Sequence, residues 1–302
     1  MNRIMLRMGP MRPRFLLLTP ACVLAGLGAG IWRTGSASLL DCALAVAGGV
    51  MAHASVNALN EHHDFRTGLD LRTRRTPFSG GTGTLPAHPD LASWTGWAGV
   101  GTALLTALIG AYFVWARGPL MLLPGLVGLA VIVAYTPRMT RNPWLCLIAP
   151  GLGFGPCMVL GAEYAVSGSF SWAGFMASLG PFFFVCDLLL LNQFPDREAD
   201  RSIGRDHWII RHGTKGGAAV YGLFLAGGYA SIVAGAAAGL TPVWTLLGLL
   251  TLPLAILAGR SAWRFHDDIP RLLPGMTLNV LVSILTPALV GIGFLVSWRG
   301  GR

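Results

Sequence analysis

The chain has 302 residues, of which 53% are hydrophobic and 12% are charged, and its mean hydropathy is +0.60. Soluble domains carry about 25% charged residues, so this composition excludes an ordinary soluble protein and indicates one that crosses a membrane several times. The formal net charge is +9. The basic residues lie in short stretches between apolar runs, which indicates contact with anionic lipid and not with nucleic acid.

Nine apolar runs approach or exceed the length of about 20 residues that a helix needs to cross a bilayer. The first follows four arginines, as in a signal peptide, but it is long and lacks a convincing cleavage site, so we expect it to be retained. The sequence therefore predicts an all-α polytopic membrane protein with one domain over residues 1–302. The predicted spans are 14–32, 39–62, 94–116, 119–136, 144–165, 172–194, 216–238, 241–262 and 271–298.

The distribution of basic residues predicts how these spans are oriented. With the N-terminus in the cytoplasm, 18 of the 22 Lys and Arg residues fall on the cytoplasmic side, as the positive-inside rule requires. The two long polar loops, 63–93 and 195–215, fall on the same side. We therefore expect a multi-pass protein of the cell (inner) membrane whose functional face is cytoplasmic.

The end of the second apolar run carries a stripe of polar residues. Four of them recur at i, i+3, i+4 and i+7, so in a helix they lie on one face, and an acid follows shortly after Gly68. Carboxylate and amide oxygens of this kind suit Mg²⁺. A polar helix end in the cytoplasm explains any single residue here, but a stripe at the edge of a span usually faces the bundle interior. The set comprises Asn57, Asn60, Glu61, Asp64 and Asp70.

A second polar stretch begins at Asn192, where the sixth apolar run ends. Asp196 and Asp200 are four residues apart, so in a helix they share one face, and such a pair is tolerated mainly when a cation lies between the carboxylates. Basic residues surround the pair, which suits an anion that arrives with the cation. The stretch predicts a metal–phosphate site. The basic residues are Arg197, Arg201, Arg205 and Lys215.

Together, the two clusters resemble the two motifs of the UbiA superfamily of intramembrane prenyltransferases. The first motif is matched by Asn60-Glu61-x-x-Asp64-x-x-x-Gly68-x-Asp70, with Glu61 where the family usually has Asp; the second is matched by Asn192, Asp196, Asp200, Gly204 and Arg205. Tyr135-Thr136-Pro137 with Arg138 resembles the loop after the fourth helix. Asn57, Asp70 and the run Arg75-Thr-Pro-Phe-Ser-Gly-Gly are similar to the dihydroxynaphthoate polyprenyltransferase branch of menaquinone synthesis.

The resemblance implies a bundle of about nine transmembrane helices around a central cavity, roofed by the two cytoplasmic loops. It implies Mg²⁺-dependent transfer of a polyprenyl group from a prenyl diphosphate to an aromatic acceptor, a quinone precursor like dihydroxynaphthoate, through an allylic carbocation. The implied catalytic residues are Asp64, Asp196 and Asp200. The implied metal ligands are Asn60, Glu61, Asp64, Asp70, Asp196 and Asp200, with Glu61 either ligating or only hydrogen-bonding. The implied substrate-binding residues are Asn57, Asn60, Arg75, Tyr135, Arg138, Asn192, Arg201, Arg205 and Lys215.

Several alternatives remain open from the sequence. The same site would serve an intramembrane terpene cyclase, or a transferase whose acceptor is a hydroxybenzoate, a homogentisate, a chlorophyllide, a haem or a glycerol phosphate. Pro150-Gly151-Leu152-Gly153 stands where an acid is often found in the naphthoate branch, and the run 207–211 departs from the family pattern. A transporter is disfavoured because the charges gather on one membrane face. Asp187, within the sixth run, is either functional or structural.

Overall fold

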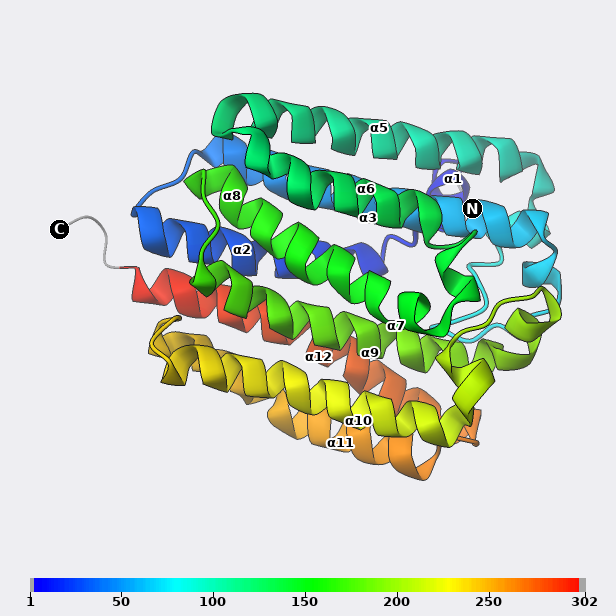
Figure 1. Ribbon diagram of the computed structural model, residues 1–302. Helices are drawn as coiled ribbons and strands as arrows, with labels where there is room; N and C mark the ends of the chain where they lie inside the picture. The colour runs from blue at the N-terminus through cyan, green and yellow to red at the C-terminus, as the bar shows by residue number, and fades with distance from the viewer. Residues whose placement is uncertain (1–2, 299–302) are drawn as a thin grey trace.

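The computed structural model describes residues 3–298, and no β-strand occurs among them. Eight helical segments are long and apolar enough to cross a membrane, and the shorter apolar segment Pro119–Ala134 makes a ninth. The prediction of an all-α bundle of about nine spans is therefore confirmed. In Figure 1 the long helices run side by side across the molecule. The eight segments are Phe15–Thr34, Leu39–Arg66, Pro89–Arg117, Pro143–Ser167, Trp172–Ser202, Trp208–Ala237, Val243–Arg264 and Ile269–Ser297.

The longest connection, 67–91, joins α3 to α5 and contains the single-turn helix α4. The second polar loop, expected over 195–215, is largely helical: Asp196 and Asp200 lie in the last turns of α9, and only residues 203–207 connect α9 to α10. We call these two connections the motif loops. The α-helices are α1 (Arg3–Met8), α2 (Leu18–Thr34), α3 (Leu39–Arg66), α4 (Thr84–Ala87), α5 (Ala92–Arg117), α6 (Leu122–Ala134), α7 (Pro143–Leu152), α8 (Gly161–Ser167), α9 (Trp172–Ser202), α10 (Trp208–Ala237), α11 (Leu252–Arg264) and α12 (Ile269–Ser297). A π-helix (Gly153–Leu160) joins α7 to α8, and a 3₁₀-helix (Val243–Thr251) precedes α11.

The long helix α9 lies at the centre of the bundle and packs against α2, α7, α10, α12 and the π-helix. Small residues allow these helices to approach closely. A Cβ added at Gly26 of α2 would lie 2.1 Å from the carbonyl oxygen of Val159, and one at Gly151 of α7 would lie 2.3 Å from that of Phe182. Larger side chains at either glycine would force the helices apart, as expected where membrane helices associate by close packing.

Two helical segments depart from a regular α-helix. The span predicted over 144–165 contains Pro150 in α7 and Pro156 in the π-helix. Proline cannot donate a backbone hydrogen bond, and single π-helical turns are frequent at functional sites. In α10, Gly213 has a φ of 71° that separates the turn at Trp208 from the rest of the helix.

Both motif loops lie at the same end of the bundle as the N-terminal helix α1, whereas α12 ends at the opposite end (Figure 1). At that opposite end, two arginines neutralise buried acids. Arg33 forms an ion pair of 3.0 Å with Glu163, and Arg117 pairs with Asp41. The arrangement places every polar residue of the two motifs at one end of the membrane-spanning helices.

Candidate active site

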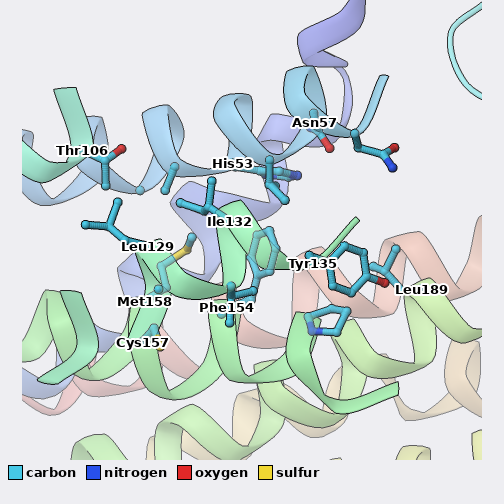
Figure 2. Close-up of a pocket in the computed structure, with 18 of the residues that line it drawn as sticks. His53, Asn57, Thr106, Leu129, Ile132, Tyr135, Phe154, Cys157, Met158 and Leu189 are labelled. Carbon is cyan, nitrogen blue, oxygen red and sulfur yellow. The ribbon is translucent and has the colours of Figure 1, made fainter. Parts of the chain in front are cut away.

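A cavity of about 530 Å³ begins at the motif loops and extends between α3, α5, α6 and the π-helix. Along α3, its lining residues run from Asp64 to Leu44, a distance of about 30 Å at about 1.5 Å per residue. Beyond its polar mouth the wall is almost entirely apolar. Figure 2 shows side chains from α6 and the π-helix meeting across this space, with His53 and Asn57 on α3.

Acidic side chains from both motifs meet at the mouth of the cavity. Asp64 is at the end of α3, Asp70 is in the 3₁₀-helix after it, and Asp196 and Asp200 are in the last turns of α9. All four line the cavity, although more than 120 residues separate the two pairs in the sequence. The fold therefore brings together the two clusters that the sequence indicated separately.

Arg205 links the two motifs. Its Nη1 donates a hydrogen bond of 2.7 Å to Oδ1 of Asp200, and its Nη2 donates to Oδ1 of Asp64. The side chain is 12% exposed. Burial lowers the pKa of the guanidinium, but the carboxylates of Asp64 and Asp200 raise it more, so the net pKa lies above its ordinary value. Arg205 is thus a fixed positive charge between the two acid pairs.

The remaining oxygens of Asp64 and Asp200 are also engaged. Nδ2 of Asn60 donates a hydrogen bond of 3.0 Å to Oδ2 of Asp64 and a second, of 3.3 Å, to Thr136. His207 lies 3.0 Å from Oδ2 of Asp200 through its Nε2. Because each carboxylate has partners on both oxygens, their orientations are fixed by the protein itself.

Asp70 and Asp196 differ, because each keeps a buried oxygen with no hydrogen-bond partner within residues 3–298: Oδ2 of Asp70 and Oδ1 of Asp196. The glycine-rich turn at Gly80 and Gly81 lies against both carboxylates. The N–H of Gly80 donates to Oδ2 of Asp196 at 3.2 Å, and a Cβ at Gly81 would lie 2.8 Å from Oδ1 of Asp70. Burial, and then the negative charges of Glu61 and Asp64, raise the pKa of Asp70 to about 7.

The donor set at the mouth fits Mg²⁺. No group of three His, Cys, Asp or Glu side chains in the described part of the chain lies close enough to hold a metal by itself. Mg²⁺ does not need such a cage, because it is usually bound through one or two carboxylates together with water and substrate phosphates. The two unpartnered carboxylate oxygens, on Asp70 and Asp196, are donors of this kind.

Glu61 occupies the family's usual Asp position but is buried away from the cavity. Its carboxylate accepts hydrogen bonds from the N–H of Thr82 at 2.9 Å, from Oγ1 of Thr82 at 2.5 Å and from Arg12 at 3.3 Å. Glu61 therefore ties the loop after α3, and the segment before α2, to the end of α3.

The residues expected in the site divide into two groups. Asn57, Asn60, Asp64, Asp70, Tyr135, Asn192, Asp196, Asp200 and Arg205 line the cavity, whereas Glu61, Arg75, Arg138, Arg201 and Lys215 do not. Arg201 points outward and donates to the carbonyl oxygen of Ile210 at 3.2 Å, and Arg75, Arg138 and Lys215 are exposed.

Sequence reasoning missed several polar residues of the cavity wall, among them Arg12, Gln193 and His207. Gln193 donates to Sγ of Cys146 at 3.4 Å. His207 belongs to the run that departs from the family pattern, which was a usable signal. Arg12 lies 48 residues before its partner Asn60, and nothing in the local sequence distinguishes it from its neighbouring arginines.

A helical bundle with an acid-lined mouth and a long apolar cavity defines an intramembrane enzyme. The UbiA prenyltransferase family matches residues 19–297, and the chain therefore belongs to this family and is a prenyltransferase. Its resemblance to the superfamily, inferred from the motifs, is confirmed.

Two curated relatives act in naphthoquinone chemistry. The chain is 27% identical to the 2-carboxy-1,4-naphthoquinone phytyltransferase of Synechocystis sp.; the match covers 58% of the chain and 58% of that relative, less than two thirds of its length. It is 28% identical to the 1,4-dihydroxy-2-naphthoate octaprenyltransferase of Mycobacterium tuberculosis, with 82% of each covered.

Solved structures share the fold. A UbiA homolog from Aeropyrum pernix K1 superposes with a TM-score of 0.71 at 23% identity, covering 94% of this chain and 98% of its own. A UbiA homolog from Archaeoglobus fulgidus, bound to DMAPP and Mg²⁺, superposes with a TM-score of 0.60 at 17% identity, covering 96% of this chain and 99% of its own.

Proposed function

We propose that the protein transfers a polyprenyl group from a prenyl diphosphate to an aromatic acceptor related to dihydroxynaphthoate. The observation that carries this proposal is the cavity itself, which is about 30 Å long, with the carboxylates of both motifs at its mouth and an apolar wall beyond them. Such a space suits a substrate with an anionic head and a long hydrocarbon tail. The two naphthoquinone-pathway relatives support the class of acceptor.

The mouth would hold the diphosphate through Mg²⁺. Asp70, with Asn60 and Asp64, would hold one ion, and Asp196, with Asp200, a second; the unpartnered oxygens of Asp70 and Asp196 are the ones left for the metal. Bound there, Mg²⁺ supplies the positive charge that stabilises the diphosphate leaving group. Arg205 would contribute a further positive charge. The protein thus fixes the head of the substrate at one end of the cavity.

The apolar wall would then protect the reacting carbon. When the C–O bond breaks, the bond electrons leave with the diphosphate, and an electron-rich aromatic carbon attacks the allylic cation before that carbon loses its proton. Exclusion of water from the cavity prevents capture by water. Phe154 lines the cavity and can face the cation, whereas Trp208 packs against Trp144, with ring centroids 4.8 Å apart.

We also propose that the protein lies in the cell (inner) membrane with the mouth of the cavity on the cytoplasmic face. The charge asymmetry of 18 of the 22 basic residues supports this orientation, and the motif loops share one end of the bundle. Labelling of single cysteines, introduced at Arg74 and at Ser36 in a cysteine-free protein, with an impermeant reagent on intact cells tests it. Reaction at position 36 alone is expected.

Product analysis tests the reaction. Membranes that contain the protein are incubated with a labelled prenyl diphosphate and 1,4-dihydroxy-2-naphthoate, with and without Mg²⁺. We expect a prenylated acceptor only with Mg²⁺, and no product from Asp64→Ala or Asp196→Ala, while Asp90→Ala, an exposed acid outside the cavity, remains active. Full activity of either site variant would refute the role of both clusters. A hydrocarbon or terpene alcohol formed from the diphosphate alone would identify a cyclase.

A further inference from the structure

The segment before α2 forms a third part of the roof over the site, beside the two motif loops. Its 3₁₀-helix Gly9–Met11 lies against α3, where the carbonyl oxygen of Met11 accepts a hydrogen bond of 3.1 Å from Asn57. A Cβ added at Gly9 would lie 2.5 Å from Oγ1 of Thr84, so the segment also packs closely on the loop after α3. These contacts fix the position of the next residue, Arg12.

Arg12 adopts a backbone conformation that is unfavourable for its residue type. Its φ of 53° and ψ of 61° are left-handed, and it is the one non-glycine residue with positive φ in the described part of the chain. L-residues pay an energetic penalty for this conformation, and such penalties concentrate at functional sites. The strained turn directs the side chain of Arg12 into the wall of the cavity.

The guanidinium of Arg12 lies beside the residues expected to hold the metal. Its Nη2 donates to Oδ1 of Asn60 at 3.2 Å and to Oε2 of Glu61 at 3.3 Å, and its side chain is 23% exposed. Its Nε is buried and has no hydrogen-bond partner within residues 3–298. A guanidinium has five N–H donors, so Arg12 retains donor capacity toward the cavity.

Within the described chain, Arg12 and Arg205 are the two Lys or Arg residues that line the cavity. Arg205 is already held by Asp64 and Asp200. Both hydrogen bonds of Arg12 are made by its Nη2, and its buried Nε has no partner within residues 3–298. Arg12 can therefore present further N–H groups to a substrate while it stays paired with the buried carboxylate of Glu61.

We propose that Arg12 is a further substrate-binding residue, whose guanidinium binds the diphosphate oxygens of the prenyl donor. The planar guanidinium matches phosphate oxygens through two parallel hydrogen bonds. This inference rests on the proposed function, because it assumes that a diphosphate enters the mouth of the cavity. It assigns to the segment before the first span a role that is separate from membrane orientation.

The test compares Arg12→Gly with wild-type protein, in detergent, at full length. Glycine adopts the left-handed conformation without strain, so this variant removes the guanidinium while it favours the observed turn. Arg12→Lys keeps the charge but not the planar fork. Arg14→Ala, which removes an exposed arginine two residues later, is the matched control. Binding of inorganic pyrophosphate with Mg²⁺ is measured by calorimetry, and KM is measured for each substrate.

We expect Arg12→Gly to stay folded but to unfold below the wild-type temperature, because the buried carboxylate of Glu61 loses its ion-pair partner. It should bind pyrophosphate more weakly by on the order of tenfold to 100-fold, the loss of one charged hydrogen-bonding group. Arg12→Lys should be intermediate and Arg14→Ala unchanged, and only the KM for the prenyl diphosphate should rise. Unchanged pyrophosphate affinity in both Arg12 variants would overturn the proposal, as would a rise confined to the KM of the acceptor. Wild-type protein that binds no pyrophosphate would overturn the proposed function itself.

Discussion

Replacement of Arg205 by methionine tests how the metal-binding site holds its acids together when Mg²⁺ is removed. The change keeps a long apolar stem and removes the charge that pairs with Asp64 and Asp200, whose side chains are 9% and 4% exposed. Breaking a buried ion pair by removing one partner costs about 3–5 kcal/mol. Because proteins somewhat smaller than this chain lose about 2–4 °C per kcal/mol, we expect the melting temperature of the metal-free protein to fall by about 5–15 °C.

The assay is thermal unfolding in detergent, first with a chelator and then with Mg²⁺. Mg²⁺ should raise the melting temperature of Arg205→Met more than that of wild type, because a cation can then replace the missing charge between the carboxylates. Arg211→Met is the control: it breaks an exposed pair with Asp206, for which a loss of at most about 1 kcal/mol is expected. An equal melting temperature for Arg205→Met and wild type in chelator would refute the reasoning.

Three further changes probe the mouth and the depth of the cavity. Folded Asp70 keeps its proton up to pH about 7 but releases it near 3.8 when unfolded. The folded state therefore binds more protons, so the unfolding free energy of the chelated protein should fall from pH 4 to 7. Asp70→Asn should make this slope shallower without abolishing it, because Asp64 is a further buried acid at the mouth; an unchanged slope would contradict the role of Asp70. Gly81→Ala should raise the Mg²⁺ concentration needed for half-maximal activity, because the added Cβ meets Asp70. Gly239→Ala, also at positive φ but with nothing within 4 Å of the Cβ, should change stability alone; the same Mg²⁺ requirement in both variants would contradict this. Gly110 lines the cavity, and nothing lies within 4 Å of a Cβ added there, so Gly110→Leu should narrow the space for the prenyl tail. The change should lower kcat/KM roughly tenfold for long prenyl diphosphates and spare geranyl diphosphate; an equal loss for both substrates would argue against a prenyl tail beside Gly110.

Much of the fold was predictable because membrane spans are encoded locally, in runs of apolar residues. The nine predicted spans correspond to the observed ones, and the shortest, Pro119–Ala134, was recognised with the others. The π-helix was not predicted. Its geometry depends on two prolines and on the close contact of Gly155 with the carbonyl oxygen of Ser178, where an added Cβ would lie 2.5 Å away, and such contacts between helices are not encoded within one segment.

The candidate site shows the same division between local and tertiary information. The motif acids and Arg205 reach the cavity, but Arg201 does not, because it follows Asp200 directly in α9 and so points about 100° away around the helix. Arg205 returns to the acids because the chain turns at Gly204, where φ is 81°. Proximity to an acid in sequence therefore did not determine which base faces it in space.

The pairing of buried acids indicates where a cation is needed. Glu61, Asp64 and Asp200 at the mouth, and Asp41 and Glu163 at the far end of the bundle, each pair with an arginine. Unpartnered buried carboxylate oxygens within residues 3–298 remain on Asp70, Asp187 and Asp196. Asp187 does not line the cavity, which leaves Asp70 and Asp196, both contacted by the turn at Gly80 and Gly81. Since a buried charge without a partner is strongly unfavourable, these two carboxylates are the part of the site whose charge no described residue compensates, and this is the reason for which we propose them as ligands of Mg²⁺.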